Sequence, residues 1–418
     1  MPRFDLLSLM SAAEDAPPAQ SVEVLAALLA REVSAHHVRL LLTTLGGSML
    51  VPVSKVETGE AWSAVGGHGE SVRLSGSEYE RARLSQRTVV DALGDVGWRA
   101  LVPVTERGDA LGILELVLPV PPDRETLEFL SGVAHTFAYC LVAARRHTDL
   151  FELTQRQLAF SVPAEIQRRL LPPAYTVEVG EFCLAGWLEP AHNVGGDTFD
   201  YSVDRDYLYV TITDAMGHST SAALLATLTV GSLRNTRRGG GDVAAQADAA
   251  NAELLAYSDG DEFVTGLILR IALRDGRMEI VNAGHPAPYL IRKGILEKVN
   301  LEVGLPLGIA SDAYNPQTIQ LQPDDRLVLV TDGYLEDKGM DVDIPAILIS
   351  TSGRHPRQVV QELSGRILGA AARRFRDDAT VVCVDWHGPQ ELRPATAGAS
   401  HDHTTLSDSE GSPPVGAG

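Results

Sequence analysis

Apolar residues near the start of the chain follow helical spacing and then change to strand-like runs. Val22, Leu25 and Leu29 lie three and four positions apart, which predicts an amphipathic helix. Apolar runs bounded by turn residues predict strands, and two of them flank Glu106-Arg107-Gly108-Asp109 as a β-hairpin. The expected elements are a helix from residue 22, strands at 38–43 and 48–53, a short helix at 78–84, and hairpin strands at 98–104 and 110–118.

A second apolar stripe, beginning after Asp123, predicts a long helix. Two interpretations of it stay open: packing on its own domain, or a dimeric coiled coil that transmits a signal. Pro163 cannot lie inside a helix without breaking or kinking it, so a new helix with Ser161 as N-cap is expected there. The stripe consists of Leu127, Leu130, Val133, Ala134, Phe137 and Leu141, continued by Leu150 and Leu153.

The pattern divides the chain into five parts with an α+β fold overall. Between residues 175 and 387 predicted strands alternate with helices. Beyond Trp386 large apolar residues almost disappear, so the tail cannot bury enough surface to offset its ordering entropy. We therefore expect a flexible start at 1–20, an N-terminal domain at 21–145, a helical linker at 146–174, a C-terminal domain at 175–387 and a disordered tail at 388–418.

Composition and charge disfavour several classes of partner. The formal net charge of −20 argues against nucleic acid and against an anionic membrane, because both attract Lys/Arg-rich surfaces. Three widely separated cysteines form neither a disulfide framework nor a zinc-binding spacing. Acidic residues interrupt any signal-like apolar segment at the N-terminus, and no apolar run approaches the roughly 20 residues that span a bilayer. We therefore expect a cytoplasmic protein with neither nucleic acid nor a membrane as its partner.

Four aspartates lie where predicted strands meet turns. Asp214 follows a β-forming run, as does Asp332, while Asp377 precedes one and Asp197 closes a turn with paired glycines. Carboxylates that gather together repel one another unless a cation lies between them, and Mg²⁺ and Mn²⁺ prefer oxygen ligands. Two interpretations stay open at this point: a hydrolytic centre holding two divalent cations, or ordinary turn and cap carboxylates.

Six short motifs follow one another in the C-terminal half of the chain. They are VGGDTFDY at 194–201, DAMGH at 214–218, NAGHPAP at 282–288, GLPLGI at 304–309, TDGYLE at 331–336 and DDATV at 377–381. In this order they resemble the PPM-type protein phosphatases, and more closely the bacterial branch typified by the stage II sporulation protein E phosphatase domain. The resemblance covers about half of the chain, from residue 166 to residue 386.

The resemblance implies a central β-sandwich flanked by helices (αββα), with a binuclear metal site at one edge. Members of this family remove phosphate from phosphoserine or phosphothreonine by direct attack of a metal-activated water. On that pattern Asp214 bridges two Mn²⁺ or Mg²⁺ ions, and the Ala215 carbonyl binds one of them. Asp332 and Asp377 complete the shell of the other ion, and Asp197 binds directly or through waters. The expected catalytic residues are Asp214, Asp197 and His218.

The chain departs from the family pattern in two respects. Ser219 stands where the family usually places a glycine after DAMGH, and no basic residue matches the phosphate-gripping arginine of the eukaryotic branch. His218 and His285 each have a possible proton-transfer role, against a structural role in a tight turn. We favour the structural role for both histidines.

Residues 22–145 resemble a GAF sensor domain. The features that carry this resemblance are the opening helix, the hairpin at 98–118 and the exit helix from Glu125. It implies a small-molecule ligand or a dimerisation role, and no Cys/His constellation indicates a haem or a bilin. By analogy with bacterial phosphatases of this layout, we expect a phosphorylated anti-anti-sigma-type regulator as substrate and a homodimer formed through the helical linker.

Three other functions stand as alternatives. The stretch GGDTF at 195–199 superficially resembles the GGDEF signature of diguanylate cyclases, but Thr198 replaces the acidic residue that this signature needs. A non-catalytic partner-switching scaffold that binds a phosphorylated regulator would be indicated by loss of a metal aspartate, and none is lost. A redox or ligand sensor with little catalytic output is the third alternative.

Overall fold

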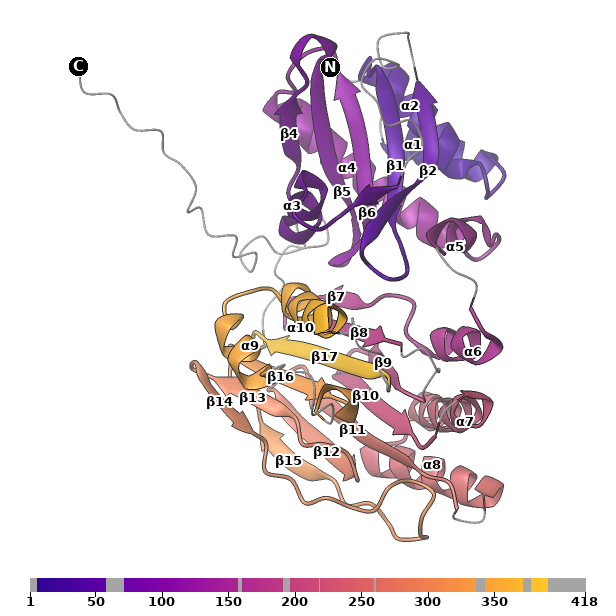
Figure 1. Ribbon diagram of the computed structural model, residues 1–418, viewed down its shortest axis with the longest axis vertical. Coiled ribbons are helices and arrows are strands. Elements are labelled where there is room, and N and C mark those ends of the chain that lie inside the picture. The colour runs from indigo at the N-terminus through magenta and orange to yellow at the C-terminus, as the bar shows by residue number, and fades with distance from the viewer. Residues whose placement is uncertain are drawn as a thin grey trace, which may run out of the picture.

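The protein folds into two domains that lie one above the other along its longest axis (Figure 1). The structure is a computed structural model. It describes residues 6–57, 71–156, 160–190, 196–217, 219–258, 261–335, 343–370 and 377–389.

The N-terminal domain is built on an antiparallel sheet with the strand order β3-β2-β1-β6-β5-β4. Strand β1, near the middle of the sheet, carries apolar residues on both faces. Its Leu40 and Leu42 face one core, and Leu41 faces the other. Helices α1, α2 and α4 cover the first face and α3 covers the second. The strands are β1 (His37–Thr43), β2 (Met49–Glu57), β3 (Val72–Arg73), β4 (Val89–Ala92), β5 (Trp98–Glu106) and β6 (Asp109–Leu118); the helices are α1 (Leu6–Asp15), α2 (Ser21–Glu32), α3 (Glu78–Ser85) and α4 (Arg124–Ala144).

The predicted hairpin is confirmed by the pairing of β5 with β6. Its turn places Arg107 at φ 45° and Gly108 at φ 85°. Glycine adopts such positive φ values without steric cost, which explains the turn at this point of the sequence. The predicted opening helix and the helix at 78–84 are confirmed as α2 and α3.

Two predictions for the N-terminal half were wrong. Residues 6–15 of the segment expected to be flexible form α1, whose Leu9 and Ala13 are buried in the domain core. The long helix ends at Ala144, and a separate short helix, α5 (Leu150–Gln155), follows. Leu153 is 70% exposed and does not continue the buried stripe.

Helix α4 packs on its own domain, which is the first of the two interpretations left open by its sequence. Its buried residues include Leu130, Phe137 and Leu141, all within the domain core. By length and composition α4 is apolar enough to cross a membrane, yet this burial identifies it as a core helix.

A second linker helix, α6 (Val162–Leu170), leads into the C-terminal domain. The predicted cap is confirmed, because the Ser161 hydroxyl accepts a hydrogen bond from the Ala164 N–H and Pro163 lies in the first turn.

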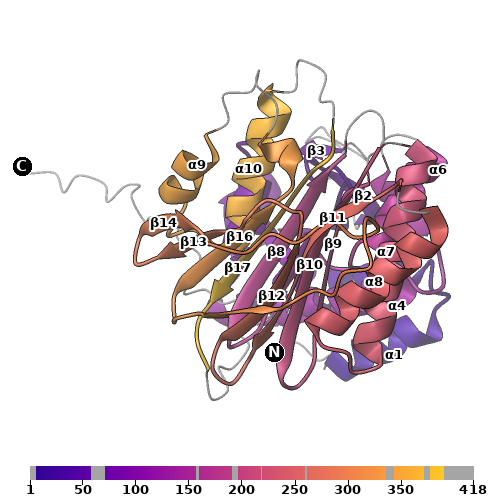
Figure 2. The same ribbon diagram turned by 90° about the horizontal axis from the view of Figure 1, so that it is seen from below.

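The C-terminal domain consists of two antiparallel sheets packed face to face and covered by helices on both outer faces (Figure 2). One sheet has the order β15-β12-β11-β10-β9, and the other has the order β14-β13-β16-β17-β8-β7. The strands are β7 (Thr176–Glu178), β8 (Phe182–Glu189), β9 (Thr198–Val203), β10 (Tyr207–Ala215), β11 (Val264–Ala272), β12 (Arg277–Ala283), β13 (Tyr289–Arg292), β14 (Ile295–Lys298), β15 (Gln317–Gln320), β16 (Asp325–Val330) and β17 (Ala379–Trp386); the helices are α7 (Ser219–Arg238), α8 (Val243–Ser258), α9 (Ile344–Ser350) and α10 (Pro356–Ala370).

The position of strand β17 in the domain explains why its sequence is largely apolar and does not alternate between apolar and polar residues. Val382 and Val384 point into the core between the two sheets, whereas Val381 and Cys383 pack against α10. Both faces of the strand are buried, so neither needs polar residues. Helices α7 and α8 cover the other sheet in the same way, through a core that includes Leu225 of α7. The predicted αββα arrangement is therefore confirmed.

The two domains touch through the β5–β6 turn and through α3. The Arg107 carbonyl accepts a hydrogen bond from the Glu178 N–H at 2.8 Å, and the Gly108 carbonyl accepts one from Arg357 Nη1 at 2.6 Å. Arg83 Nη2 of α3 donates to Gln361 Oε1 of α10 at 2.7 Å. The hairpin that the sequence predicts is thus also a docking element. The tail from residue 390 onward lies outside the described residues.

Candidate metal centre

Four strand ends deliver carboxylates to one edge of the sandwich. Asp214 lies near the end of β10 and Asp197 just before the neighbouring β9. In the second sheet, Asp332 follows β16 and Asp378 precedes its partner β17. Because these strands are antiparallel neighbours, the end of one lies beside the start of the next. Residues far apart in sequence therefore meet at this edge.

Two glycines allow the segments to approach closely. A Cβ on Gly196 would lie 2.5 Å from the Ala215 Cβ, and a Cβ on Gly333 would lie 1.9 Å from the Asp378 carbonyl oxygen. Both distances are shorter than non-bonded atoms tolerate. Glycine at these positions therefore brings the Asp197 turn against the end of β10 and the Asp332 turn against the start of β17.

Asp197 is fixed between the two sheets by hydroxyl groups. Its Oδ2 accepts hydrogen bonds from Thr331 Oγ1 and from Thr380 Oγ1, each at 2.7 Å. The residue is 2% exposed, so its orientation is set by these bonds rather than by water.

The linker helix also contacts this centre. Gln167 of α6 donates from Nε2 to the Asp197 carbonyl oxygen at 2.9 Å and also to the Asp378 carboxylate. Gln167 is 3% exposed and Asp378 is 1% exposed. A single buried amide thus joins the linker to two segments of the carboxylate edge.

Burial and mutual repulsion strongly raise the pKa values of two carboxyl groups of the centre. Burial, followed by the charges of Asp332, Asp377 and Asp378, raises the pKa of Asp214 to about 7. Burial, with the charges of Asp214 and Asp378, raises the pKa of Asp197 well above its usual range, although the two threonine hydrogen bonds oppose this. The carboxylates are therefore close enough to destabilise one another's charged forms.

This donor set fits divalent cations. The largest charge effects on Asp214 come from other carboxylates, so a positive charge placed among them would remove the repulsion. Carboxylate oxygens are the ligands that Mg²⁺ and Mn²⁺ prefer. The structure thus brings together four of the residues singled out in the sequence: Asp197, Asp214, Asp332 and Asp377. The Ala215 backbone adjoins them at the end of β10.

Two residues of the centre were missed by sequence reasoning. Asp378 is the buried member of the Asp377-Asp378 pair, and only its neighbour was selected. Gln167 lies in a helix whose amphipathic pattern draws attention to its leucines, so a single glutamine carried no signal. His218 lies outside the described residues. His285 is buried in a turn, and burial lowers its pKa to about 3, which agrees with the structural role favoured from sequence.

Residues 204–387 match the family model for Stage II sporulation protein E (SpoIIE). The matched range includes Asp214, Asp332, Asp377 and Asp378. We refer to the domain that contains this match as the SpoIIE-type domain.

The SpoIIE-type domain also has a characterised relative. The phosphoserine phosphatase RsbP of Bacillus subtilis (strain 168) is 25% identical over 204 residues, which cover 46% of this chain and 49% of RsbP. The chain thus spans about half the length of RsbP.

Two solved structures resemble this protein at low identity. The RsbU and RsbW domains of Rv1364c from Mycobacterium tuberculosis are 20% identical, with a TM-score of 0.45 over 52% of this chain and 63% of that one. The PP2C phosphatase domain of SpoIIE from Bacillus subtilis, solved with a fragment of its regulatory domain, is 20% identical, with a TM-score of 0.44 over 51% of this chain and 66% of that one.

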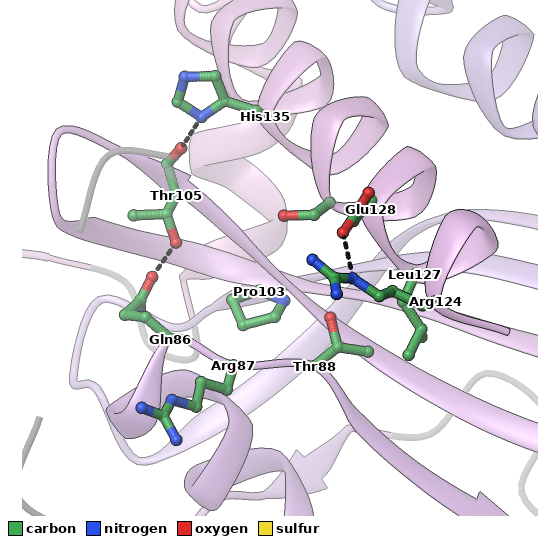
Figure 3. Close-up of a pocket in the computed structure, with 10 residues that line it drawn as sticks. Gln86, Arg87, Thr88, Pro103, Thr105, Arg124, Leu127, Glu128 and His135 are labelled. Atoms are coloured by element: carbon green, nitrogen blue, oxygen red, sulfur yellow. Dashed lines mark hydrogen bonds and ion pairs between the residues drawn. The ribbon is translucent and has the colours of Figure 1, made fainter. Parts of the chain in front are cut away.

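The N-terminal domain has a small hollow of its own, about 240 Å³ in volume, between α4 and the β5 side of the sheet (Figure 3). His135 Nδ1 lies 3.0 Å from the Thr105 carbonyl oxygen, and the Thr105 hydroxyl contacts the Gln86 amide. Arg124 pairs with Glu128 at its rim. Most of the lining residues are of polar types, and the volume suits a small ligand only.

Proposed function

We propose that the SpoIIE-type domain is a metal-dependent protein phosphatase acting on phosphoserine or phosphothreonine. The observation that carries this proposal is the buried carboxylate edge, at which several aspartates raise one another's pKa. Such a centre calls for divalent cations, and we propose two Mn²⁺ or Mg²⁺ ions. When bound, the ions would supply electrostatic stabilisation of the phosphate and an activated water.

We propose a separate role for each residue of this centre. Asp214 would contribute to the binding of both ions, the Ala215 carbonyl would bind one ion, and Asp332 with Asp377 would bind the other. Asp197 is held rigidly by Thr331 and Thr380, which suits a ligand that acts directly or through waters. His218 stays a candidate proton-transfer residue.

The substrate and the control of the enzyme are proposals by analogy. RsbP is named a phosphoserine phosphatase, and we infer a phosphorylated regulator of the anti-anti-sigma type as the substrate here. We further propose that the N-terminal domain is a GAF-like sensor with a small-molecule ligand, that the protein is cytoplasmic, and that it forms a homodimer through the linker.

The test is phosphatase activity of the full-length protein toward p-nitrophenyl phosphate and a phosphoserine peptide. We expect turnover with Mn²⁺ or Mg²⁺ that is lost in EDTA and falls at least about 1000-fold in Asp214→Ala. Asp206→Ala, in an exposed turn of the same domain, is the matched control and should keep its activity. Binding of the phosphopeptide without turnover in either metal would instead support the non-catalytic scaffold.

A further inference from the structure

A large cleft of about 1340 Å³ lies at the junction of the two domains. Its lining comes from both sides: Arg83 and Arg145 belong to the N-terminal half, and Arg357 belongs to α10 of the SpoIIE-type domain. Figure 1 shows α10 and β7 on the side of the lower domain that faces the upper one. None of the five aspartates of the metal centre lines this cleft. It is therefore a separate site.

The cleft concentrates positive charge in a protein that is strongly acidic. Ten arginines line it against five carboxylates, although the chain as a whole has a net charge of −20. Some of these arginines are neutralised; Arg234 and Arg237, for example, both pair with Asp200. Others have no carboxylate partner among the ion pairs of the described residues, and these include Arg83, Arg145 and Arg357.

The unpaired arginines also have unused hydrogen-bond donors. Arg357 is 7% exposed, and while its Nη1 donates to the Gly108 carbonyl, its Nε and Nη2 have no partner among the described residues. The Nε atoms of Arg83, Arg145 and Arg168 are likewise buried without a partner there. A buried guanidinium normally has its donors satisfied, so these groups are suited to an acceptor that the described residues do not provide.

The pKa values of Arg83 and Asp109 are also consistent with unbalanced positive charge in the cleft. Burial, together with the nearby charge of Arg357, lowers the pKa of Arg83 to about 10. Asp109 lies among these arginines, and the cost of burying its charge outweighs their attraction, because its pKa is raised to about 7. Glu80, Glu152 and Glu178 also act on Arg83, Arg145 and Arg357, respectively. Even so, the arginines that line the cleft outnumber its carboxylates. An excess of positive charge is left in the cleft.

We propose that this cleft binds a small molecule carrying two or more phosphate groups, such as a nucleoside diphosphate or triphosphate. Phosphate oxygens match the planar fork of arginine and accept several hydrogen bonds at once. Tyr175 and Trp187 also line the cleft and offer aromatic surface to a base. A small molecule is favoured over a protein segment because the cleft lies between two domains that already touch at the β5–β6 turn.

Such a ligand would bridge the domains. Arg83 and Arg145 would hold it from the sensor side and Arg357 from the catalytic side, so binding would stabilise the arrangement seen here relative to any other arrangement of the domains. The N-terminal hollow and the metal centre do not contribute to this binding. The proposal therefore stands whether or not the phosphatase assignment is correct.

The experiment is calorimetric titration of full-length protein with inorganic pyrophosphate, tripolyphosphate, ADP and ATP in EDTA. Without divalent cations, the carboxylate centre repels these anions and cannot contribute. We expect saturable binding that becomes tighter from pyrophosphate to tripolyphosphate and is weakened at least 10-fold in Arg357→Gln. The matched control is Arg274→Gln, which removes the same charge from an exposed hairpin turn and should change the affinity less than 2-fold.

A second measurement keeps the test valid if Arg357→Gln fails to fold. Phenylglyoxal modification of the wild-type protein, followed by mass spectrometry, should show Arg83 and Arg145 protected by tripolyphosphate while Arg274 is not. Absence of binding to all four probes, unchanged affinity in Arg357→Gln, or equal protection of Arg274 would each overturn the proposal. Tighter binding of a phosphoserine peptide than of tripolyphosphate at Arg357 would replace the small molecule by a protein ligand and would also overturn it.

Discussion

The carboxylate edge gathers negatively charged groups, whereas the arginine cleft gathers positively charged groups. At the edge, burial and the neighbouring carboxylates raise the pKa of Asp214, and in the cleft burial and the charge of Arg357 lower the pKa of Arg83. Both arrangements are unfavourable without a counter-ion, so each indicates the ligand class that would relieve it: divalent cations in the first case and phosphates in the second.

The two sites differ in how they are assembled. The aspartates all belong to one domain and are held by glycine contacts and threonine hydrogen bonds, so their geometry is set by a single core. The arginines come from two domains, so the cleft exists only while the domains stay together. The comparison shows that a site within one domain keeps its geometry by itself, whereas a site between two domains depends on their arrangement and therefore suits a ligand whose binding controls the protein.

After the loss of activity expected in Asp214→Ala, the largest effect concerns the contact between the linker helix and the carboxylate edge. Gln167→Leu removes the donor to the Asp197 carbonyl and to Asp378 while keeping the side-chain size. Loss of such a supporting contact typically costs about 10- to 100-fold in activity or metal affinity. Steady-state kinetics over a Mn²⁺ titration should show this loss. Gln317→Leu, on the edge strand β15, should not, and equal effects of the two variants would remove Gln167 from the centre.

A second prediction concerns repulsion at the edge. In EDTA, Asp214→Asn should raise the free energy of unfolding by about 1–2 kcal/mol, because it removes a buried charge from a cluster of like charges. With saturating Mn²⁺ the order should reverse, since metal at 100 times its Kd stabilises only the wild type, by about 2.7 kcal/mol. Urea denaturation under both conditions measures this. A variant that is less stable than wild type in EDTA would show that the contacts of the Asp214 carboxylate outweigh the repulsion from its neighbours.

A third prediction uses the histidine beside the cleft. His355 precedes α10 and is fully buried; its Nε2 lies 3.3 Å from Cys183 Sγ and 3.6 Å from Glu178 Oε2. Burial, with the charge of Arg357, lowers its pKa to about 4, although Glu178 and Asp385 oppose this. Below pH 6.5 the unfolded chain therefore binds a proton that the folded protein does not.

The free energy of unfolding should accordingly fall as the pH drops from about 6.5 toward 4. His355 alone accounts for a slope of about 1.4 kcal/mol per pH unit in this range. Urea denaturation of His355→Gln at several pH values should give a shallower acid slope than the wild type. His147→Gln, at an exposed position, is the matched control and should keep the wild-type slope. Identical slopes in all three proteins would contradict the burial of a neutral His355.

The smallest expected effect is in the cleft. Arg83→Gln should raise the free energy of unfolding without polyphosphate by less than about 1 kcal/mol, because it removes a buried charge near Arg357 but keeps an amide that can reach Gln361. With tripolyphosphate present, the wild type should become the more stable of the two. A variant destabilised under both conditions would show that Arg83 acts only as a contact between the domains.

Local patterns predicted much of the fold. The hairpin at Arg107-Gly108 follows from turn residues between apolar runs, and the cap at Ser161 follows from the proline two positions later. Both depend on neighbours in sequence. The end of α4 at Ala144 could not be predicted in this way, because the apolar spacing continues to Leu153 and only the limits of the domain core stop the buried stripe.

By itself, the sequence determined the strand ends that carry aspartates and the order of motifs that indicated a SpoIIE-type domain. Both are properties of short segments, in which residue type and spacing are sufficient. Tertiary structure decided that Asp378 is the buried member of its pair, that Gln167 reaches the carboxylate edge, and that Arg83, Arg145 and Arg357 meet in one cleft. These facts depend on which segments pack together across long stretches of chain, such as the 211 positions between Gln167 and Asp378. Burial and charge act through space rather than along the chain.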